Sequence, residues 1–115
     1  MAIKLNKAAY DHAVEIIKKG LEVEHDTNNW TDVNPSRDEK IKFLNTHSLE
    51  EYGLWFLGID TDIKEDDSSK FIYPIGDFSV LHKSGLLTAE QQATQKHHHE
   101  IKSAAQKLLE MINKK

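Results

Sequence analysis

Apolar and small residues recur every three or four positions in several parts of the chain, a pattern that predicts amphipathic helices. The first of these segments runs from Asn6 to Lys19. Asn6 is suited to cap the N-terminus of this helix, and Gly20 is suited to end it. The residues that fall on one face of the helix are Leu5, Ala9, Ala13, Ile16 and Gly20.

The clearest helical stripe lies between about His98 and Asn113, at positions Ile101, Ala104, Ala105, Leu108 and Ile112. A preceding stripe predicts a helix from Asp77 to about Gln95. Its members are Phe78, His82, Leu86, Ala89 and Ala93. Gly85 and a capping box of Thr88 with Gln91 would allow a break near its middle, but we expect a continuous helix. The two helices should pair as an antiparallel hairpin.

Two further helices are marked by capping boxes in the middle of the chain. Ser36 with Glu39 predicts a short helix that ends at Asn45. Ser48 with Glu51 opens another, which we expect to continue until Gly58. The face of this second helix would carry Leu49, Tyr52, Gly53 and Phe56.

The remaining segments carry turn and loop residues. We expect residues 21–36 to form a loop with Trp30 as a buried anchor, and residues 58–70 to form a polar, acidic loop. Phe71, Ile72 and Tyr73 are β-prone, but Pro74 limits them to an edge strand or a short extended piece.

These patterns predict a mainly α fold: one compact domain over residues 1–115, with about five helices and a C-terminal antiparallel helical hairpin. A short two-stranded pairing between residues 21–24 and 70–73 is compatible with this fold. The large aromatic side chains should cluster where the middle loops pack on the hairpin. They are Trp30, Trp55, Phe56, Phe71, Tyr73 and Phe78.

Composition narrows the class of protein. The chain has 115 residues, of which 38% are hydrophobic and 30% are charged, and its formal net charge is −4. It contains no cysteine, which excludes disulfides and thiol chemistry and agrees with a cytoplasmic location. No apolar run reaches the roughly 20 residues of a membrane span, and the N-terminal segment does not resemble a signal peptide, so we expect no membrane partner.

Asp77 and His82 are the main candidates for chemistry. An aspartate that begins a helix accepts backbone N–H groups, and this structural role is the interpretation that we favour. Residues five apart on a helix point in different directions, so Asp77 could orient His82 only if the first turn were distorted. In the alternative interpretation, His82 is a general base or a ligand that works with a histidine from another element.

Two other segments resemble metal sites by composition alone. Consecutive residues on a helix are about 100° apart, so His97, His98 and His99 cannot converge on one ion, and we expect a helix start with solvated histidines. Asp60 and Asp62 match the first and third positions of a calcium loop, but Lys64 stands where a ligand should be. We therefore predict a solvated acidic loop, no metal site and no cofactor.

The sequence also lacks motifs for nucleophilic catalysis or for cradling phosphate, such as GxSxG, GxxxxGK[ST] and GxGxxG. Arg37 is the only arginine, which disfavours bidentate recognition of phosphate or guanine. Lys96, Lys102 and Lys107 could line one side of the C-terminal helices, although a solvated lysine-rich face is the more common meaning of such a pattern.

Several motifs together resemble a family of small bacterial proteins of unassigned function. The first is W-[ST]-x-x-x-P-[ST], with Trp30, Thr31, Pro35 and Ser36. The second is W-x-L-G-x-D, with Trp55, Leu57, Gly58 and Asp60. The third is K-x-x-[FY]-P-x-G-D-[FL]-x-x-[VL]-H, with Lys70, Tyr73, Pro74, Gly76, Asp77, Phe78, Leu81 and His82.

The resemblance covers most of residues 28–110 and implies no activity. Relatives are usually arginine-rich around the helix that carries His82, whereas this chain has Lys83 alone there. The support for an anion or nucleic-acid site on that surface is correspondingly weaker.

We expect the protein to be a small binding module without catalysis. Its surface would be a groove or patch around Trp55, Tyr73 and His82, and its partner would be a macromolecule, with a protein favoured. The alternative is a metal-dependent or acid–base hydrolase that uses His82, Asp77 and either His12 or His47. Association with nucleic acid through the C-terminal lysines is the weakest hypothesis, because the chain is acidic.

Overall fold

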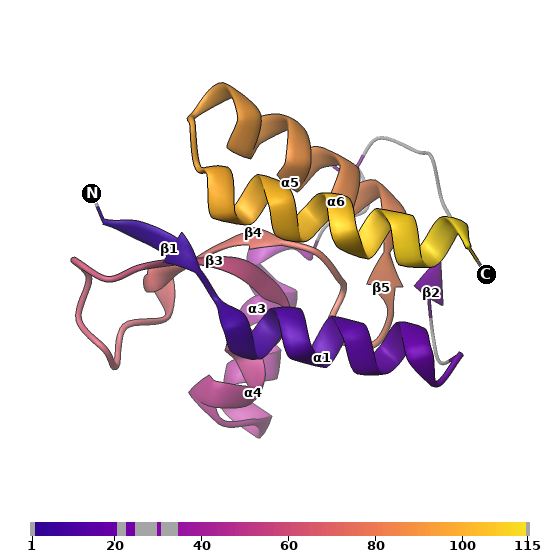
Figure 1. Cartoon of the computed structure of the whole chain (residues 1–115). Coiled ribbons are helices and arrows are strands. Elements are labelled where there is room, and N and C mark those ends of the chain that lie inside the picture. The colour runs from indigo at the N-terminus through magenta and orange to yellow at the C-terminus, as the bar shows by residue number, and fades with distance from the viewer. Residues whose placement is uncertain (1, 21–22, 25–29, 31–34, 115) are drawn as a thin grey trace.

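The computed structural model describes residues 2–20, 23–24, 30 and 35–114, and it shows helices packed around a small antiparallel sheet (Figure 1). The sheet contains β1 (Ile3–Leu5), β3 (Phe56–Asp60) and β4 (Phe71–Pro74) in the order β1-β3-β4. A second, parallel pair joins β2 (Val23–Glu24) to β5 (Leu81–His82).

The described residues also form five α-helices and one short 3₁₀ helix, η1. The bounds of the helices are α1 (Lys7–Lys18), α3 (Arg37–Thr46), α4 (Leu49–Gly53), η1 (Ser68–Lys70), α5 (Lys83–Gln95) and α6 (His99–Asn113). Helices α5 and α6 run antiparallel on one side of the sheet, and α3 and α4 lie on the opposite side (Figure 1). Helix α1 runs beside α6.

The sheet separates two hydrophobic clusters, as the alternation of side chains along β3 illustrates. Leu57 faces the main core, which contains the buried faces of α1, α5 and α6. Phe56 faces a second core with Tyr52 and Trp55, against which Phe43 of α3 and Phe78 pack.

The prediction of a mainly α fold is therefore wrong, because the described chain is a mixed α/β structure. The helix that we expect to continue until Gly58 ends at Gly53, and Phe56–Asp60 forms the central strand β3. Both faces of this strand are covered, so its apolar residues are consecutive and do not alternate with polar ones. Strand β1 was not predicted at all, and three residues are too few to show a period.

The expected strand pairing is also wrong in its partners, since β2 pairs with β5 and β4 pairs with β3. Residues 21–22 of that prediction lie outside the described residues. The helix predicted from Asp77 begins only at Lys83, after a tight turn and strand β5.

The predictions of the two capping boxes, of a continuous helix through Gly85 and of the C-terminal hairpin are confirmed. Both capping boxes form, at Ser36 with Glu39 and at Ser48 with Glu51. Helix α5 continues through Gly85, and it packs along α6 as the predicted hairpin. Asn6 precedes α1 but does not cap it with its side chain, which donates instead to the Gly53 and Phe56 carbonyls at 2.9 and 3.0 Å.

The aromatic residues do not form the single cluster that we expected. Phe56, Phe71, Phe78 and Trp55 belong to the second core, whereas Tyr73 belongs to the main core. Trp30 is buried, with 4% of its surface exposed, and lies beside Gly85 and His82. Within the described part of the chain, no helix combines the length and the apolar character needed to cross a membrane.

Candidate functional site

A tight hairpin turn brings the two main candidate residues together. Gly76 and Leu81 form an antiparallel bridge, and the Asp77 N–H donates to the Val80 carbonyl at 3.1 Å. The His82 N–H donates to the Ile75 carbonyl at 3.0 Å, which closes the base of the turn. The chain therefore reverses direction between Ile75 and His82, immediately before α5 begins.

The Asp77 carboxylate is the centre of this turn. Its Oδ1 accepts the N–H groups of Ser79 and Val80 at 3.0 and 2.8 Å, and its Oδ2 lies 3.0 Å from Nε2 of His82. Burial by itself would raise the pKa of Asp77, but the hydrogen bonds from His82, Val80 and Ser79 outweigh it and lower the pKa below its ordinary value. Asp77 is thus held as a carboxylate.

His82 is the buried partner of this pair. Only 8% of its surface is exposed, and it occupies the residue before the first turn of α5. Its ring lies 5.2 Å from the Trp30 ring, centroid to centroid. The contact of the Trp30 indole restricts the imidazole on a second side, so the ring that binds Asp77 has a defined position.

The interpretation of Asp77 as a helix cap is wrong, because no helix begins there. Oδ1 of Asp77 nevertheless accepts hydrogen bonds as the side chain of a helix cap does, from the N–H groups two and three residues ahead in the turn. The turn also removes the geometric objection to a contact between Asp77 and His82, since the chain is not helical between them.

The other histidines of the hydrolase hypothesis are engaged elsewhere. The His12 ring meets the Trp55 ring edge-on at 5.1 Å, and the His47 ring stacks on Phe43 at 3.9 Å. Burial lowers the pKa of His12, partly offset by a hydrogen bond with the Leu54 backbone. Among the described residues, no group of three or more histidine or carboxylate side chains is placed to hold a metal ion.

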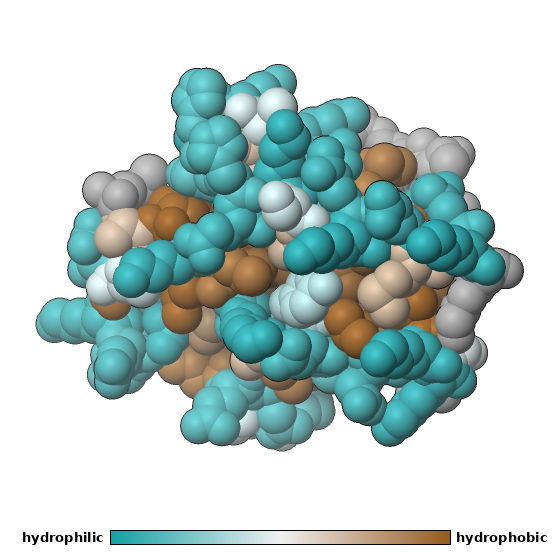
Figure 2. Space-filling model, viewed as in Figure 1, coloured by the Kyte–Doolittle hydropathy of each residue, from teal (hydrophilic) through white to brown (hydrophobic). Residues whose placement is uncertain are grey.

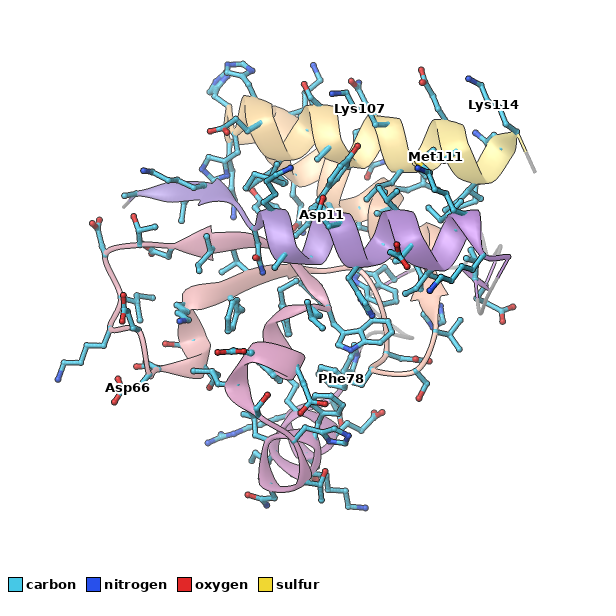
Figure 3. All side chains as sticks on the ribbon, turned by 60° about the horizontal axis from the view of Figure 1, so that its bottom comes forward. Asp11, Asp66, Phe78, Lys107, Met111 and Lys114 are labelled. Carbon is cyan, nitrogen blue, oxygen red and sulfur yellow. The ribbon has the colours of Figure 1, made fainter. Side chains whose placement is uncertain are left out.

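Phe78, at the tip of the turn, has a left-handed backbone with φ of +72°. A non-glycine residue in this region is uncommon and strained. Its ring stacks against Phe43 of α3 at 4.5 Å and against Tyr52 of α4 at 5.5 Å, and those two rings lie 6.4 Å from each other. Figure 3 shows Phe78 beside α3 and α4, on the side of the molecule away from α6. The turn therefore fastens these two helices to the sheet.

An open groove of about 550 Å³ lies where the turn meets α3. We name it the Phe43–Phe78 groove after the two half-buried rings that line it. The other lining residues are polar or charged: Glu39, Lys42, Asn45, Thr46 and Asp77. No pattern in the sequence indicates this groove, because its apolar part comes from segments that are 35 positions apart.

The three predicted binding residues lie beneath the surface. Trp55, Tyr73 and His82 are 8%, 5% and 8% exposed. The Trp55 ring lies under Gly76, where an added Cβ would come within 2.4 Å of Cε3. Such residues can shape a surface but offer little area for a partner.

Tyr73 has an unexpected partner in one of the three adjacent histidines. Its hydroxyl lies 2.7 Å from Nδ1 of His98, and burial raises the pKa of Tyr73. Burial also lowers the pKa of His98, with help from the charges of Lys96 and His97. The prediction of solvated histidines is therefore wrong for His98, and no pattern in the sequence indicates a contact across 25 positions.

The acidic loop does not present Asp60 as an open ligand. Asp60 is 5% exposed, and its Oδ1 accepts the Asp62 N–H at 3.0 Å. This carboxylate stabilises the end of β3 and the turn that follows it. Asp66, by contrast, lies on the exposed outer part of the loop (Figure 3).

No protein-family model matches this chain, and no curated protein or solved structure is significantly similar to it. The resemblance to a family of small bacterial proteins thus remains an expectation from the motifs.

Proposed function

We propose that the protein is a binding module that takes a segment of a partner protein in the Phe43–Phe78 groove. The observation that carries this proposal is the position of the groove, between α3 and a strained turn that is fastened by Asp77 and His82. Backbone strain is retained where the surrounding structure enforces it, and it is concentrated at functional sites.

The groove combines aromatic and polar surface, as protein-binding sites do. Both faces of the Phe43 ring are covered, one by His47 and one by Phe78. The rings therefore offer their edges to the groove, where an aliphatic or aromatic side chain of a partner can pack. Asn45 and Thr46 lie on the rim and can bond to its backbone.

The charges of the groove favour a basic residue next to that apolar anchor. Glu39 and Asp77 supply two carboxylates against one ammonium from Lys42. The Asp77 side chain keeps 33% of its surface exposed and accepts three hydrogen bonds, whereas a carboxylate has about four acceptor sites. Within the described part of the chain, one acceptor site thus stays open to a lysine or arginine of the partner.

The buried motif residues support this proposal indirectly. Trp55 lies under Gly76, and His82 fixes Asp77, so both hold the turn that carries Phe78. Their role in binding would be to position the turn, and the contact itself would fall to Phe43, Phe78 and the rim.

The test uses a randomised peptide library displayed on phage and selected against the purified chain. We expect enriched peptides with an apolar residue beside a basic one. Thr46→Arg, which fills the rim, should weaken their binding about tenfold or more. Peptides that bind Thr46→Arg as well as the original chain would refute the proposed site, and so would a library that yields no binder.

Thr94→Arg is the matched control for this variant. Thr46 and Thr94 are both exposed, lie in the last turn of a helix and donate a hydrogen bond to the carbonyl four residues earlier, at 3.1 and 2.7 Å. Thr94 lies on α5, outside the groove, so Thr94→Arg should leave peptide binding unchanged.

A second candidate function is acid–base hydrolysis, which the contact between Asp77 and His82 favours. An aspartate can orient a histidine and stabilise its protonated form, as hydrolase triads require. This hypothesis needs a nucleophile or an activated water next to His82. It predicts turnover of a panel of ester and phosphoester substrates that His82→Gln abolishes. Turnover that persists in His82→Gln, or none by the original chain, would exclude it.

A further inference from the structure

Among the described residues, nothing pairs with the outer edge of strand β1, which leaves one edge of the sheet open. In an antiparallel pair, alternate residues point their N–H and C=O groups toward the partner strand. The Thr61 N–H donates to the Ala2 carbonyl at 2.9 Å, and the Asn6 N–H donates to the Leu57 carbonyl at 2.8 Å. Even-numbered residues therefore bond to β3, and Ile3 and Leu5 point their backbone groups outward.

These outward groups have no backbone partner within the described part of the chain. Strand β1 pairs only with β3 among the described strands, and no loop or helix residue described there bonds to the backbone of Ile3 or Leu5. An edge of this kind is a template for another strand.

The side chains of β1 alternate between two environments. Ile3 and Leu5 are half-buried and pack against the main core, whereas Lys4 is exposed on the opposite face. A strand added to this edge would place its own alternate side chains on the same two faces. Residues on the Ile3 and Leu5 face would point toward α6, and a residue opposite Lys4 would point to solvent beside its ammonium.

A groove of about 440 Å³ adjoins this edge, between the start of α1 and the first half of α6. We name it the β1 groove. Leu5, Tyr10 and Ala104 form its less polar part. Figure 2 shows apolar surface between α1 and α6 with hydrophilic side chains on both borders.

The charged border of the β1 groove is predominantly basic. Lys7 comes from α1 and Lys107 from α6, with the His99 ring nearby, and Glu100 is the one carboxylate in the lining. Lys7 also lies 3.7 Å from Asp11, but both side chains are largely exposed, so this pair is weak. Lys4 adds a further positive charge at the edge itself.

We infer that the β1 edge binds an extended acidic segment of a partner protein by strand addition. The segment forms backbone hydrogen bonds with Ile3 and Leu5. Its apolar side chains lie on the α6 face, over the β1 groove, and an acidic side chain lies opposite Lys4. The preferred pattern is therefore apolar-acidic-apolar, with a further acidic residue within reach of Lys7 or Lys107.

A second copy of this chain is a poor occupant of the same edge. Antiparallel pairing of two β1 strands about Ile3 and Leu5 would place Lys4 directly opposite the Lys4 of the other copy. Like charges at directly opposed positions are destabilising, and an edge lysine is a common device against such pairing. The same lysine attracts an acidic strand.

The test uses a synthetic heptapeptide that alternates valine and glutamate, titrated into the full chain with ¹⁵N-labelled backbone. We expect saturable shifts of the Ile3 and Leu5 amide signals and slower hydrogen exchange at both. The same peptide with N-methyl groups on alternate amides cannot donate to the edge, and a peptide that alternates valine and lysine has the wrong charge. Both should bind about tenfold more weakly or worse.

Two variants complete the experiment. Ile3→Pro removes an outward N–H without removing a bond to β3, and it should abolish binding, whereas Ile3→Ala loses the side chain but keeps the N–H and should retain most of it. Lys4→Glu should reverse the preference between the two peptides. Equal binding of the methylated peptide, equal binding of the lysine peptide, or no shift at Ile3 and Leu5 at millimolar peptide would overturn the inference.

The inference is independent of the Phe43–Phe78 groove. Thr46 lies on the opposite side of the sheet from the β1 groove, so Thr46→Arg should leave the heptapeptide titration unchanged. A negative result in the test of one site therefore does not count against the other site.

Discussion

Asp77 and His82 are joined across a tight turn, with Oδ2 of the aspartate 3.0 Å from Nε2 of the histidine. The bond connects the tip of the turn to the start of α5. The turn carries Phe78 into the second core, while His82 lies beside Trp30. This pair therefore controls the shape of the Phe43–Phe78 groove without contributing most of its area.

Replacement of Asp77 should separate its two roles. Asp77→Ala removes all three hydrogen bonds and should lower the free energy of unfolding by about 2 kcal/mol. Asp77→Asn keeps an oxygen for the Ser79 and Val80 N–H groups and should cost about half as much. Urea denaturation measures both, with Asp66→Asn in the exposed loop as a control that should leave stability unchanged. Equal losses for the two Asp77 variants would contradict this division.

The Asp77 contribution should also depend on pH in a defined direction. The pKa of Asp77 is lower in the folded chain than the ordinary value of 3.8, so its contribution is fully present above that value. It is lost as the pH falls through the lower, folded pKa. The part of the stability difference between the original chain and Asp77→Asn that comes from the titration of Asp77 should therefore be complete above about pH 4 and shrink in acid below it.

Two histidines should make the protein less stable in mild acid. Burial lowers the pKa of both His12 and His98 from the ordinary value of 6.5, so the unfolded chain binds protons before the folded chain does. Their stabilising contribution is complete above pH 6.5 and decreases as the pH falls through the lowered values. Urea midpoints at several pH values should show this slope, and the double variant His12→Gln, His98→Gln should flatten it. An unchanged slope in that variant would contradict the assignment.

Local signals in the sequence were sufficient for the two capping boxes and for helix α6, but not for the start of α5 or the end of α4. The capping boxes at Ser36 and Ser48 involve groups only three residues apart, so sequence spacing determines them. The stripe of α6 follows from one covered face, which is buried along its whole length. The packing of α5 on α6 then follows, because a short connection joins two helices that each have one buried face.

The sheet could not be predicted because the strand pairs that form it are far apart in the sequence. Strand β3 is buried on both faces and reads as the continuation of the apolar helix before it. Its partner β1 is more than 50 positions away, and three residues carry no periodic signal. Asp77 and His82 are candidates from the sequence, but their contact depends on a turn. The apolar stripe over residues 78–93 predicts a helix where this turn lies.

Gly76 should tolerate no side chain. A Cβ at this position would lie 2.4 Å from Cε3 of Trp55 and 2.7 Å from the Val80 carbonyl oxygen, and the latter is backbone that closes the turn. We expect Gly76→Ala to lower the free energy of unfolding by about 2 kcal/mol or more. Gly20→Ala is the control, since nothing lies within 4 Å of its added Cβ and only its φ of +65° opposes the change. Thermal unfolding should show the larger loss for Gly76→Ala, and the reverse order would refute the close contact.

Phe78 offers a test of the strain at the tip of the turn. In most structures, replacement by glycine destabilises a protein more than replacement by alanine, because glycine gains more freedom on unfolding. At a φ of +72° the order should be reversed, since alanine keeps the steric cost of the left-handed backbone and glycine does not.

Both variants lose the ring that stacks against Phe43 and Tyr52, and each should cost about 2 kcal/mol for that loss. Phe78→Gly should then be more stable than Phe78→Ala by about 1 kcal/mol, measured by urea denaturation of the two variants side by side. A control pair at Phe43, on helix α3, should show the ordinary order, with glycine less stable than alanine by a similar amount. If Phe78→Gly were the less stable of its pair, the backbone at the tip of the turn would not be strained. The turn would then owe its shape to the Asp77 hydrogen bonds alone, and the strain that supports the proposed binding site would be absent.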